Sequence, residues 1–303
     1  MTAATTMPVT DAGQLPPSVT LADPAAEPLA TAPSRIGRLL RSPPFMVGAA
    51  IVLFWAFCAL FGPFVVPYDP YSDDLLNTLA PPSAAHWFGT DQIGRDIFSR
   101  VIVGARPILS VAPLATLLAT AAGTTLGLLT GYVGGWLDSL IGRLIEVLLA
   151  LPLIVVALLV LVALGPSSST VIGVIGIIFT PLIARTVRAA VLSERSLDYV
   201  AAAELRGEGA LHIMFVEILP NVLPPILVET TVRLGYAIFT VASLSFLGFG
   251  IQPPSADWGL AISENYGMMT GGYWWTVSFA AAATASLVVG VNLVADGIQA
   301  VLE

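Results

Sequence analysis

DYVAAAELRGEGALHIMFVEILP, residues 198–220, is a polar, alanine-rich stretch between two long apolar runs of the chain. The runs, near residues 170–190 and 221–247, are each long enough to cross a bilayer, whose hydrocarbon core of about 30 Å takes roughly 20 residues of helix. Charged side chains are costly in hydrocarbon, so the stretch between the runs belongs outside it. We therefore predict two transmembrane helices joined by a loop at the membrane surface.

The rest of the chain extends this pattern to an all-α membrane protein. Of the 303 residues, 56% are hydrophobic and 11% are charged, whereas soluble domains carry about 25% charged residues. Further apolar runs of spanning length lie near residues 45–66, 107–133, 144–164 and 274–297. We expect six transmembrane helices, with the polar stretch between the fourth and the fifth.

The N-terminal residues 1–34 have a different composition. They are rich in Ala, Thr and Pro and lack the apolar periodicity of a packed helix, so they are predicted to form a disordered tail. They also lack the initial cations and short apolar core of a secretory signal. Residues 35–303 are then the expected membrane domain.

The distribution of arginine predicts the orientation in the membrane. If the N-terminus is cytoplasmic, eight arginines fall in cytoplasmic segments: Arg35, Arg38, Arg41, Arg143, Arg185, Arg188, Arg195 and Arg206. Three fall in outer segments: Arg95, Arg100 and Arg106. Because cytoplasmic loops carry the excess of positive charge, we expect a multi-pass protein of the cell membrane with both termini and residues 198–220 in the cytoplasm.

Several classes of function are excluded by composition. A net charge of −8 with scattered arginines argues against nucleic-acid binding, which needs clustered cations. The chain has no Lys and so no Walker A loop, GxxxxGK[ST]. The patterns HExxH and GxSxG are absent, and the single Cys58 rules out a disulfide or multi-cysteine metal site within one chain. We predict no catalytic residue, metal site or cofactor.

Residues 198–220 are predicted to form two short helices joined by a turn. Asp198 suits the first turn of a helix, and the alanines that follow have high helix propensity. Gly207 is a natural stop, because glycine adopts a left-handed conformation at no cost. Four apolar residues of the second helix share a face that we expect to pack on the bundle: Leu211, Met214, Phe215 and Ile218. The hairpin fits a groove in a partner protein or an amphipathic connector resting on lipid.

This stretch resembles a motif of a known family. The spacing of Ala202-Ala203, Gly207 and Ile218-Leu219-Pro220 is similar to the EAA loop of binding-protein-dependent ABC importer permeases. Five further stretches resemble the second permease of dipeptide and oligopeptide importers, in the same order: HWFGTDQIGRDIFSRVIVGAR (86–106), GYVGGWLDSLIGRLIEVLLALP (131–152), ILPNVLPPILVE (218–229), ASLSFLGFGIQPPSADWG (242–259) and NLVADGI (292–298). The resemblance covers about residues 35–303.

The resemblance implies the type I ABC importer permease fold and a set of partners. These are a second, non-identical permease, two ABC ATPases that hold the ATP and Mg, an external binding protein and a peptide substrate. A permease for nickel or a nickel chelate is the alternative within transport, although no His/Cys cluster lines a predicted span. A membrane sensor or scaffold that binds a cytosolic protein without transport is the alternative from another class.

The resemblance also implies which residues couple the chain to an ATPase. Within the first helix of the hairpin, Tyr199 and the three alanines Ala201, Ala202 and Ala203 would supply the contact surface. Asp198, Val200 and Glu204 belong to the same coupling hairpin. Gly207 would supply the turn, and Leu211, Met214 and Phe215 would hold the hairpin against the bundle. The family usually has Glu where this chain has Ala201, and Glu204, one helical turn further on, is the candidate replacement.

Three further groups of residues stand out within and beside the predicted spans. Glu229 and Arg233 are four residues apart and predicted to pair, either as a structural ion pair or as part of a pathway for peptide termini. A stripe of small residues is predicted to let another helix approach closely: Gly123, Gly127, Gly131 and Gly135. Asp91, Arg95 and Asp96 are expected to form a structural polar cluster in the first outer loop.

Overall fold

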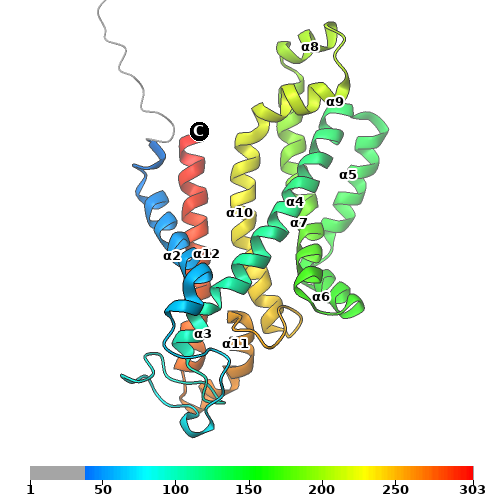
Figure 1. Ribbon diagram of the computed structural model, residues 1–303. Coiled ribbons are helices and arrows are strands. Elements are labelled where there is room, and N and C mark those ends of the chain that lie inside the picture. The colour runs from blue at the N-terminus through cyan, green and yellow to red at the C-terminus, as the bar shows by residue number, and fades with distance from the viewer. Residues whose placement is uncertain (1–37, 303) are drawn as a thin grey trace, which may run out of the picture. The chain divides into compact units, whose positions relative to one another are not determined.

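The computed structural model describes residues 38–302, and this part of the chain is built from helices without a β-strand. The predicted disordered tail, residues 1–34, lies outside the described residues. Figure 1 shows a bundle of long helices, with a small helix, α8, at one end and the helix α11 with long loops at the other. The fold is therefore an all-α bundle of the kind that apolar sequence favours in a bilayer.

Five stretches of helix in residues 38–302 are individually long and apolar enough to cross a membrane. The first stretch is helix α2 (Pro43–Val65) and the last is helix α12 (Trp275–Leu302). The fourth stretch ends in helix α10 (Leu219–Phe246). The second stretch, Ile97–Val133, consists of α3 (Ile97–Val103) and α4 (Ala105–Val133). The third is α7 (Ser168–Arg195), and α10 is preceded by α9 (Ala210–His212) and a π-helical turn, Ile213–Ile218.

Where the sequence predicts a continuous helix over residues 144–164, the structure has a bent pair of helices. Helix α5 (Gly135–Ala150) and helix α6 (Leu153–Leu164) meet at 90°. Pro152 explains the break, because proline has no N–H and disfavours helical geometry at the residue before it. Leu151 accordingly has extended angles, φ −88° and ψ 141°. At 12 residues, α6 is about 18 Å long and cannot cross the hydrocarbon by itself.

Helices α4 and α7 pack closely along a stripe of glycines. An added Cβ at Gly123, Gly127 or Gly131 would lie 2.6–2.8 Å from the Cβ of a β-branched residue on α7. The facing residues are spaced four apart: Ile183, Val187 and Val191. A Cβ atom cannot come so near another, so the absence of a side chain is what permits the two backbones to approach.

Gly135, the fourth glycine of the predicted stripe, does not belong to it. Helix α4 ends at Val133, and Gly135 is the first residue of α5, with a positive φ of 63°. A Cβ there would meet nothing within 4 Å. The prediction for Gly135 is wrong because the four-residue spacing assumes that the helix continues. The helix ends at Val133, and the chain turns back at Gly134 and Gly135.

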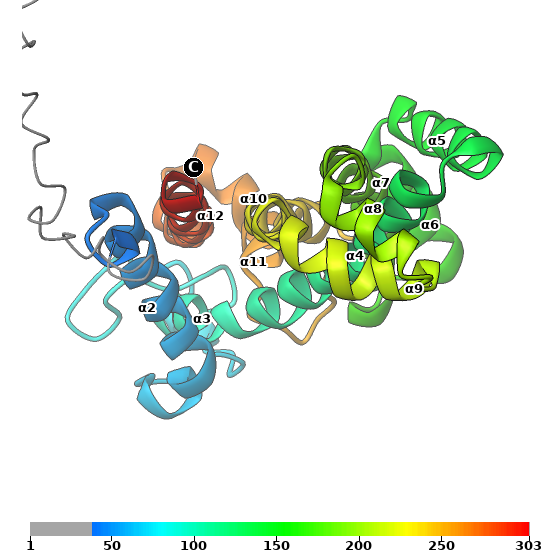
Figure 2. The ribbon, with the colours of Figure 1, turned by 90° about the horizontal axis from the view of Figure 1, so that it is seen from above.

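The ends of the bundle are distinct. The start of α2, the end of α12 and helix α8 lie at one end, and α11 (Trp258–Asn265) lies at the other. Figure 2, a view from above, shows α2 beside α12 at one side of the unit and α5 at the opposite side, with α10, α4 and α7 between them. The two ends carry the polar groups that are described next.

Candidate functional site

The candidate site is the helical hairpin between α7 and α10. Two residues separate the end of α7 from helix α8 (Asp198–Leu205), which has Asp198 in its first turn, where a carboxylate is stabilised by the positive end of the helix dipole. After Arg206 the chain reverses at Gly207, whose φ is 77°. A side chain is strained in that conformation, so Gly207 provides the turn that the sequence predicts.

Helix α8 turns small and apolar side chains outward. Ala201 and Ala202 are exposed, as expected of a contact surface, but Ala203 is buried beneath the helix with Val200, so the prediction that Ala203 belongs to that surface is wrong. Leu205 is 90% exposed. An exposed leucine next to two exposed alanines leaves a low, partly apolar surface at the tip of the hairpin, of a kind that fits into a groove of another protein.

Two tyrosine hydroxyls link α8 to neighbouring helices: Tyr199 of α8 contacts α7, and Tyr132 of α4 contacts α8. The Tyr199 hydroxyl donates to Glu194 Oε2 (2.8 Å), and the Tyr132 hydroxyl donates to Glu204 Oε1 (3.2 Å). Arg195 lies over the Tyr132 ring, 5.8 Å from its centroid. Burial, then the hydrogen bond to Glu194, raises the pKa of Tyr199 above its ordinary value, so its hydroxyl stays protonated and able to donate. Glu204 is exposed, and Tyr132 of α4 orients its carboxylate.

The second half of the hairpin packs differently from the prediction. Met214 and Ile218 are buried, but Leu211 is 67% exposed and Phe215 is 43% exposed. Ile213, which the sequence pattern left out, is buried in their place. The reason is the π-helical turn Ile213–Ile218. Its hydrogen bonds join residues five apart, so Ile213 and Ile218 share the inner face and the i, i+3, i+4 pattern fails.

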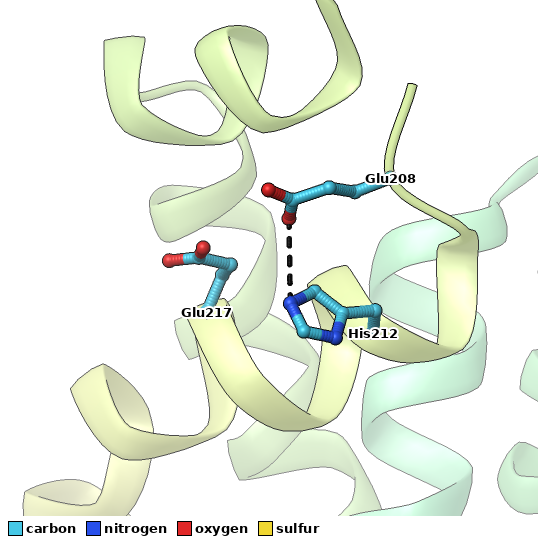
Figure 3. A group of neighbouring side chains, drawn as sticks. All are labelled: Glu208, His212 and Glu217. Carbon is cyan, nitrogen blue, oxygen red and sulfur yellow. Dashed lines mark ion pairs between the residues drawn. The ribbon is translucent and has the colours of Figure 1, made fainter. Parts of the chain in front are cut away.

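A cluster of charged side chains closes the hairpin. Arg206 Nε donates to Glu208 Oε1 (2.6 Å) and Arg206 Nη2 donates to Glu217 Oε1 (3.2 Å). Figure 3 shows His212 Nε2 facing Glu208 Oε2, at 3.5 Å. The hydrogen bond to Glu208 raises the pKa of Arg206. Glu208, His212 and Glu217 offer ligand atoms within 4.8 Å of one another, and carboxylates and imidazole are donor types that metals use. Arg206 already binds both carboxylates, and its guanidinium joins the end of α8 to the π-helical turn.

Within the bundle, Glu229 and Arg233 of α10 form an ion pair. The distance from Arg233 Nε to Glu229 Oε1 is 2.6 Å, and the guanidinium lies 5.4 Å from the centroid of the Tyr236 ring. Arg233 and Tyr236 also line a cavity of about 530 Å³, together with Thr240 and apolar residues of α6 and α7. Arg233, one member of the pair, therefore borders an apolar cavity beside the bend between α5 and α6.

The opposite end of the bundle carries a buried network of charges. Arg95 Nε lies 2.7 Å from Asp91 Oδ2, and Arg95 Nη2 lies 2.7 Å from Glu264 Oε2. Arg100 adds a second guanidinium, 3.5 Å from Glu264. The sequence indicates a cluster of Asp91, Arg95 and Asp96, but Glu264 is 169 residues further along the chain than Arg95, and no local pattern points to it.

Two further carboxylates are buried at this end. Asp96 caps α3 through the Ser99 amide (2.8 Å) and lies 2.9 Å from His86 Nδ1. Asp257 caps α11 through the Leu260 amide (2.9 Å), and its Oδ2 has no hydrogen-bond partner in the described chain. Burial raises the pKa of Asp257 to about 6. Buried carboxylates therefore fix the starts of α3 and α11 through hydrogen bonds to backbone amides.

Comparison with known proteins places this arrangement in a family. Residues 123–303 match the family described as binding-protein-dependent transport system inner membrane component, and residues 35–82 match the N-terminal TM domain of oligopeptide transport permease C. The chain is 40% identical over 264 residues to the dipeptide transport system permease protein DppC of Escherichia coli (strain K12), covering 85% of this chain and 88% of that protein.

Two more relatives are similar over most of their length. The identity is 37% over 262 residues to the probable D,D-dipeptide transport system permease protein DdpC of Escherichia coli (strain K12), covering 86% of this chain and 88% of that one. It is 36% over 292 residues to the di/tripeptide transport system permease protein DppC of Pseudomonas aeruginosa (strain UCBPP-PA14), covering 92% and 95%.

A solved structure shows the same fold. The MetNI methionine ABC transporter, in an inward-facing conformation, contains a chain that matches with a TM-score of 0.56 at 18% identity, covering 67% of this chain and 96% of that one. The described residues have the type I ABC importer permease fold. The chain belongs to the family of binding-protein-dependent transport system inner membrane components.

Proposed function

We propose that this chain is one of two non-identical permease subunits of an ATP-driven peptide importer. An external binding protein would deliver the peptide, and two ABC ATPases would hold and hydrolyse ATP with Mg. The names of the relatives, which are dipeptide permeases, support a peptide as the substrate. The observation that carries the proposal is the exposed face of helix α8. This face has small side chains, and the helix is linked to α4 through Tyr132 and to α7 through Tyr199.

The connectivity supports α8 as the point where ATP-driven motion enters. The chain has no Walker A loop, so the energy has to come from another protein. Only Ser196 and Leu197 separate α7 from α8, and α9 continues through the π-helical turn into α10. A force on α8 therefore reaches two membrane helices at once. Asp198, Ala201 and Ala202 would form the contact, with Gly207 as the turn.

Glu204 is the candidate for the acid that the family has at the position of Ala201. Its Oε1 accepts from Tyr132 (3.2 Å), which leaves Oε2 for a donor on the ATPase. In this arrangement Tyr132 fixes the carboxylate in one orientation. Glu204 would both position α8 and contribute negative charge one turn from the usual place.

The same proposal gives the topology. With α8 in the cytoplasm, the start of α2 and the end of α12 lie on the cytoplasmic side, because all three are at one end of the bundle. Residues 35–303 would form the permease domain, and residues 1–34 would precede it in the cytoplasm. The arginine distribution supports this orientation.

Glu229 and Arg233 are proposed to line the translocation pathway. Their 2.6 Å pair lies beside the 530 Å³ cavity, and a guanidinium over an aromatic ring is a site where a peptide carboxylate can bind. The bend at Pro152 forms part of the wall. An Arg233→Leu variant that transports the same peptides at the same rate would contradict this assignment.

The test is transport by the complete complex in proteoliposomes. We expect a dipeptide-loaded binding protein to stimulate ATP hydrolysis and peptide uptake together, and Ala202→Trp to lower both at least tenfold, because the new ring would fill the surface that enters the ATPase. Leu159→Trp, a change at an exposed residue of α6, is the control. Uptake of nickel or a nickel chelate alone would favour the alternative substrate, and a purified complex without an ATPase would contradict the proposal.

A further inference from the structure

A polar cavity of about 550 Å³ lies between α5 and α7 and takes no part in the proposed transport cycle. Its charged lining comes from both helices: Asp138, Arg143 and Glu146 of α5, and Arg185 and Arg188 of α7. Three guanidinium groups thus surround a space that has two carboxylates. The cavity is the only one of those described for residues 38–302 that is lined by several arginines.

Only one of the three arginines is paired. Arg188 binds Asp138 through two parallel hydrogen bonds, Nε to Oδ1 at 2.6 Å and Nη2 to Oδ2 at 2.7 Å. Arg143 and Arg185 are exposed and form no ion pair within residues 38–302. Glu146 is exposed and likewise has no ion pair in this part of the chain. The cavity therefore offers two free guanidinium groups against one free carboxylate.

The length of α7 places Arg185 and Arg188 at the edge of the hydrocarbon. Helix α7 has 28 residues and is about 42 Å long at 1.5 Å per residue, longer than a core of about 30 Å. If its polar start at Ser168 marks one boundary, Arg185 lies about 26 Å along the helix and Arg188 about 30 Å along. Both are then at the level where head groups begin on the α8 side.

The rest of the surface of α5 is apolar and exposed. Four exposed side chains of this helix that do not line the cavity are apolar: Leu140, Leu144, Val147 and Leu148. An apolar face beside unpaired cations at the edge of the hydrocarbon matches a phospholipid, whose acyl chains and phosphate are joined in one molecule. Guanidinium groups suit phosphate because they are planar, weakly hydrated and able to donate two hydrogen bonds.

We propose that the cavity between α5 and α7 binds the head group of an anionic phospholipid, with Arg143 and Arg185 on its phosphate and the acyl chains along α5. Arg188 and Asp138 form a fixed wall, because each satisfies the other. Glu146 opposes the bound anion and limits its affinity. A soluble phosphate shares the charge but lacks the chains, so it would bind far more weakly.

The experiment measures lipid retention by the assembled complex. The complex is purified in mild detergent, stripped of lipid and titrated with phosphatidylglycerol or phosphatidylcholine, and bound lipid is counted by native mass spectrometry. We expect selective retention of phosphatidylglycerol. The change R143Q/R185Q should weaken it by about fivefold for each guanidinium removed, whereas Glu146→Gln should strengthen it. Both changes are at exposed side chains and should leave the fold intact.

Two controls keep the outcome decisive. R106Q removes an exposed arginine at the start of α4, outside this cavity and at the other end of the bundle, and should leave retention within twofold of the wild type. Inorganic phosphate at millimolar concentration should not displace phosphatidylglycerol. The proposal is overturned if R143Q/R185Q retains lipid as well as the wild type, if phosphatidylcholine binds equally, or if free phosphate displaces the lipid.

Discussion

The two ends of the bundle hold their charged side chains in opposite ways. At the α11 end, Asp91 and Arg100 have side chains less than 5% exposed, and they are joined to Arg95 and Glu264 in one network. At the hairpin end, Arg206 is 54% exposed and binds two glutamates at the surface. Buried ion pairs are expensive to break, whereas exposed pairs contribute little.

This difference indicates which end can move. At the α11 end, ion pairs between buried side chains hold the loops. Separating these pairs would leave charged groups buried without a partner and without water to solvate them. The hairpin end can open and let water replace each bond. The hairpin end therefore has the weaker polar attachments of the two. Three changes would break or sharpen this contrast.

The largest effect is expected from Arg95→Leu. The change leaves Asp91, with its side chain 2% exposed, beside a leucine, and breaking a buried pair in this way costs about 3–5 kcal/mol. Thermal unfolding of the purified complex measures the loss. Arg106→Leu is the matched control, because Arg106 is exposed and surface changes usually stay within about 0.5 kcal/mol. Equal effects of the two changes would refute the contrast.

A smaller effect, with a pH dependence, is expected from Asp257→Asn. The folded-state pKa of Asp257 is raised from 3.8 to about 6, so the folded state binds the proton more tightly than the unfolded state. Stability is therefore highest below about pH 4, falls as the pH rises to about 6, and is constant above that, with a cost of up to about 3 kcal/mol.

Asn keeps the helix cap and cannot ionise. The variant should match the wild type near pH 4 and be more stable at pH 7.5, and melting temperatures measured across this range test the difference. Asp257→Ala is the control for the cap: it removes the ionisation and the hydrogen bond to Leu260 together. Parallel pH profiles for Asp257→Asn and the wild type would show that the carboxyl is not buried in this way.

The smallest change in stability is expected from Arg206→Gln. Its hydrogen bonds to Glu208 and Glu217 are exposed, so the melting temperature should not change measurably. The turn itself should loosen, because Arg206 is the group that joins its two sides, and amide hydrogen exchange should become severalfold faster in residues 207–217. Arg38→Gln is the control. A clear fall in melting temperature would place the hairpin among the rigid parts of the molecule.

Local patterns in the sequence were sufficient where a single helix decides the outcome. The apolar runs predict the long helices, because the length needed to cross hydrocarbon is a property of one segment. Glu229 and Arg233 are four residues apart in α10 and form the pair that this spacing predicts. Gly207 adopts the positive φ that its place after a short helix indicates.

Periodicity misled where the helix itself changes. Gly135 continues the four-residue spacing of the glycine stripe, but α4 ends before it. Leu211 and Phe215 follow an α-helical pattern through a π-helical turn, and both are exposed. A pattern of i, i+3 and i+4 assumes a constant rotation per residue, and a break or a wider turn shifts every later side chain to another face.

The sequence by itself determined the membrane class, the long apolar segments and, through its motifs, the permease family. These depend on composition and on residues close together in the chain. Only the tertiary structure decided that Glu264 neutralises Arg95, that Asp257 is buried, and that Arg143 and Arg185 face one cavity. Burial and pairing between distant segments depend on how helices pack, and the pKa and the energy of a charge follow from those surroundings, not from its neighbours in sequence.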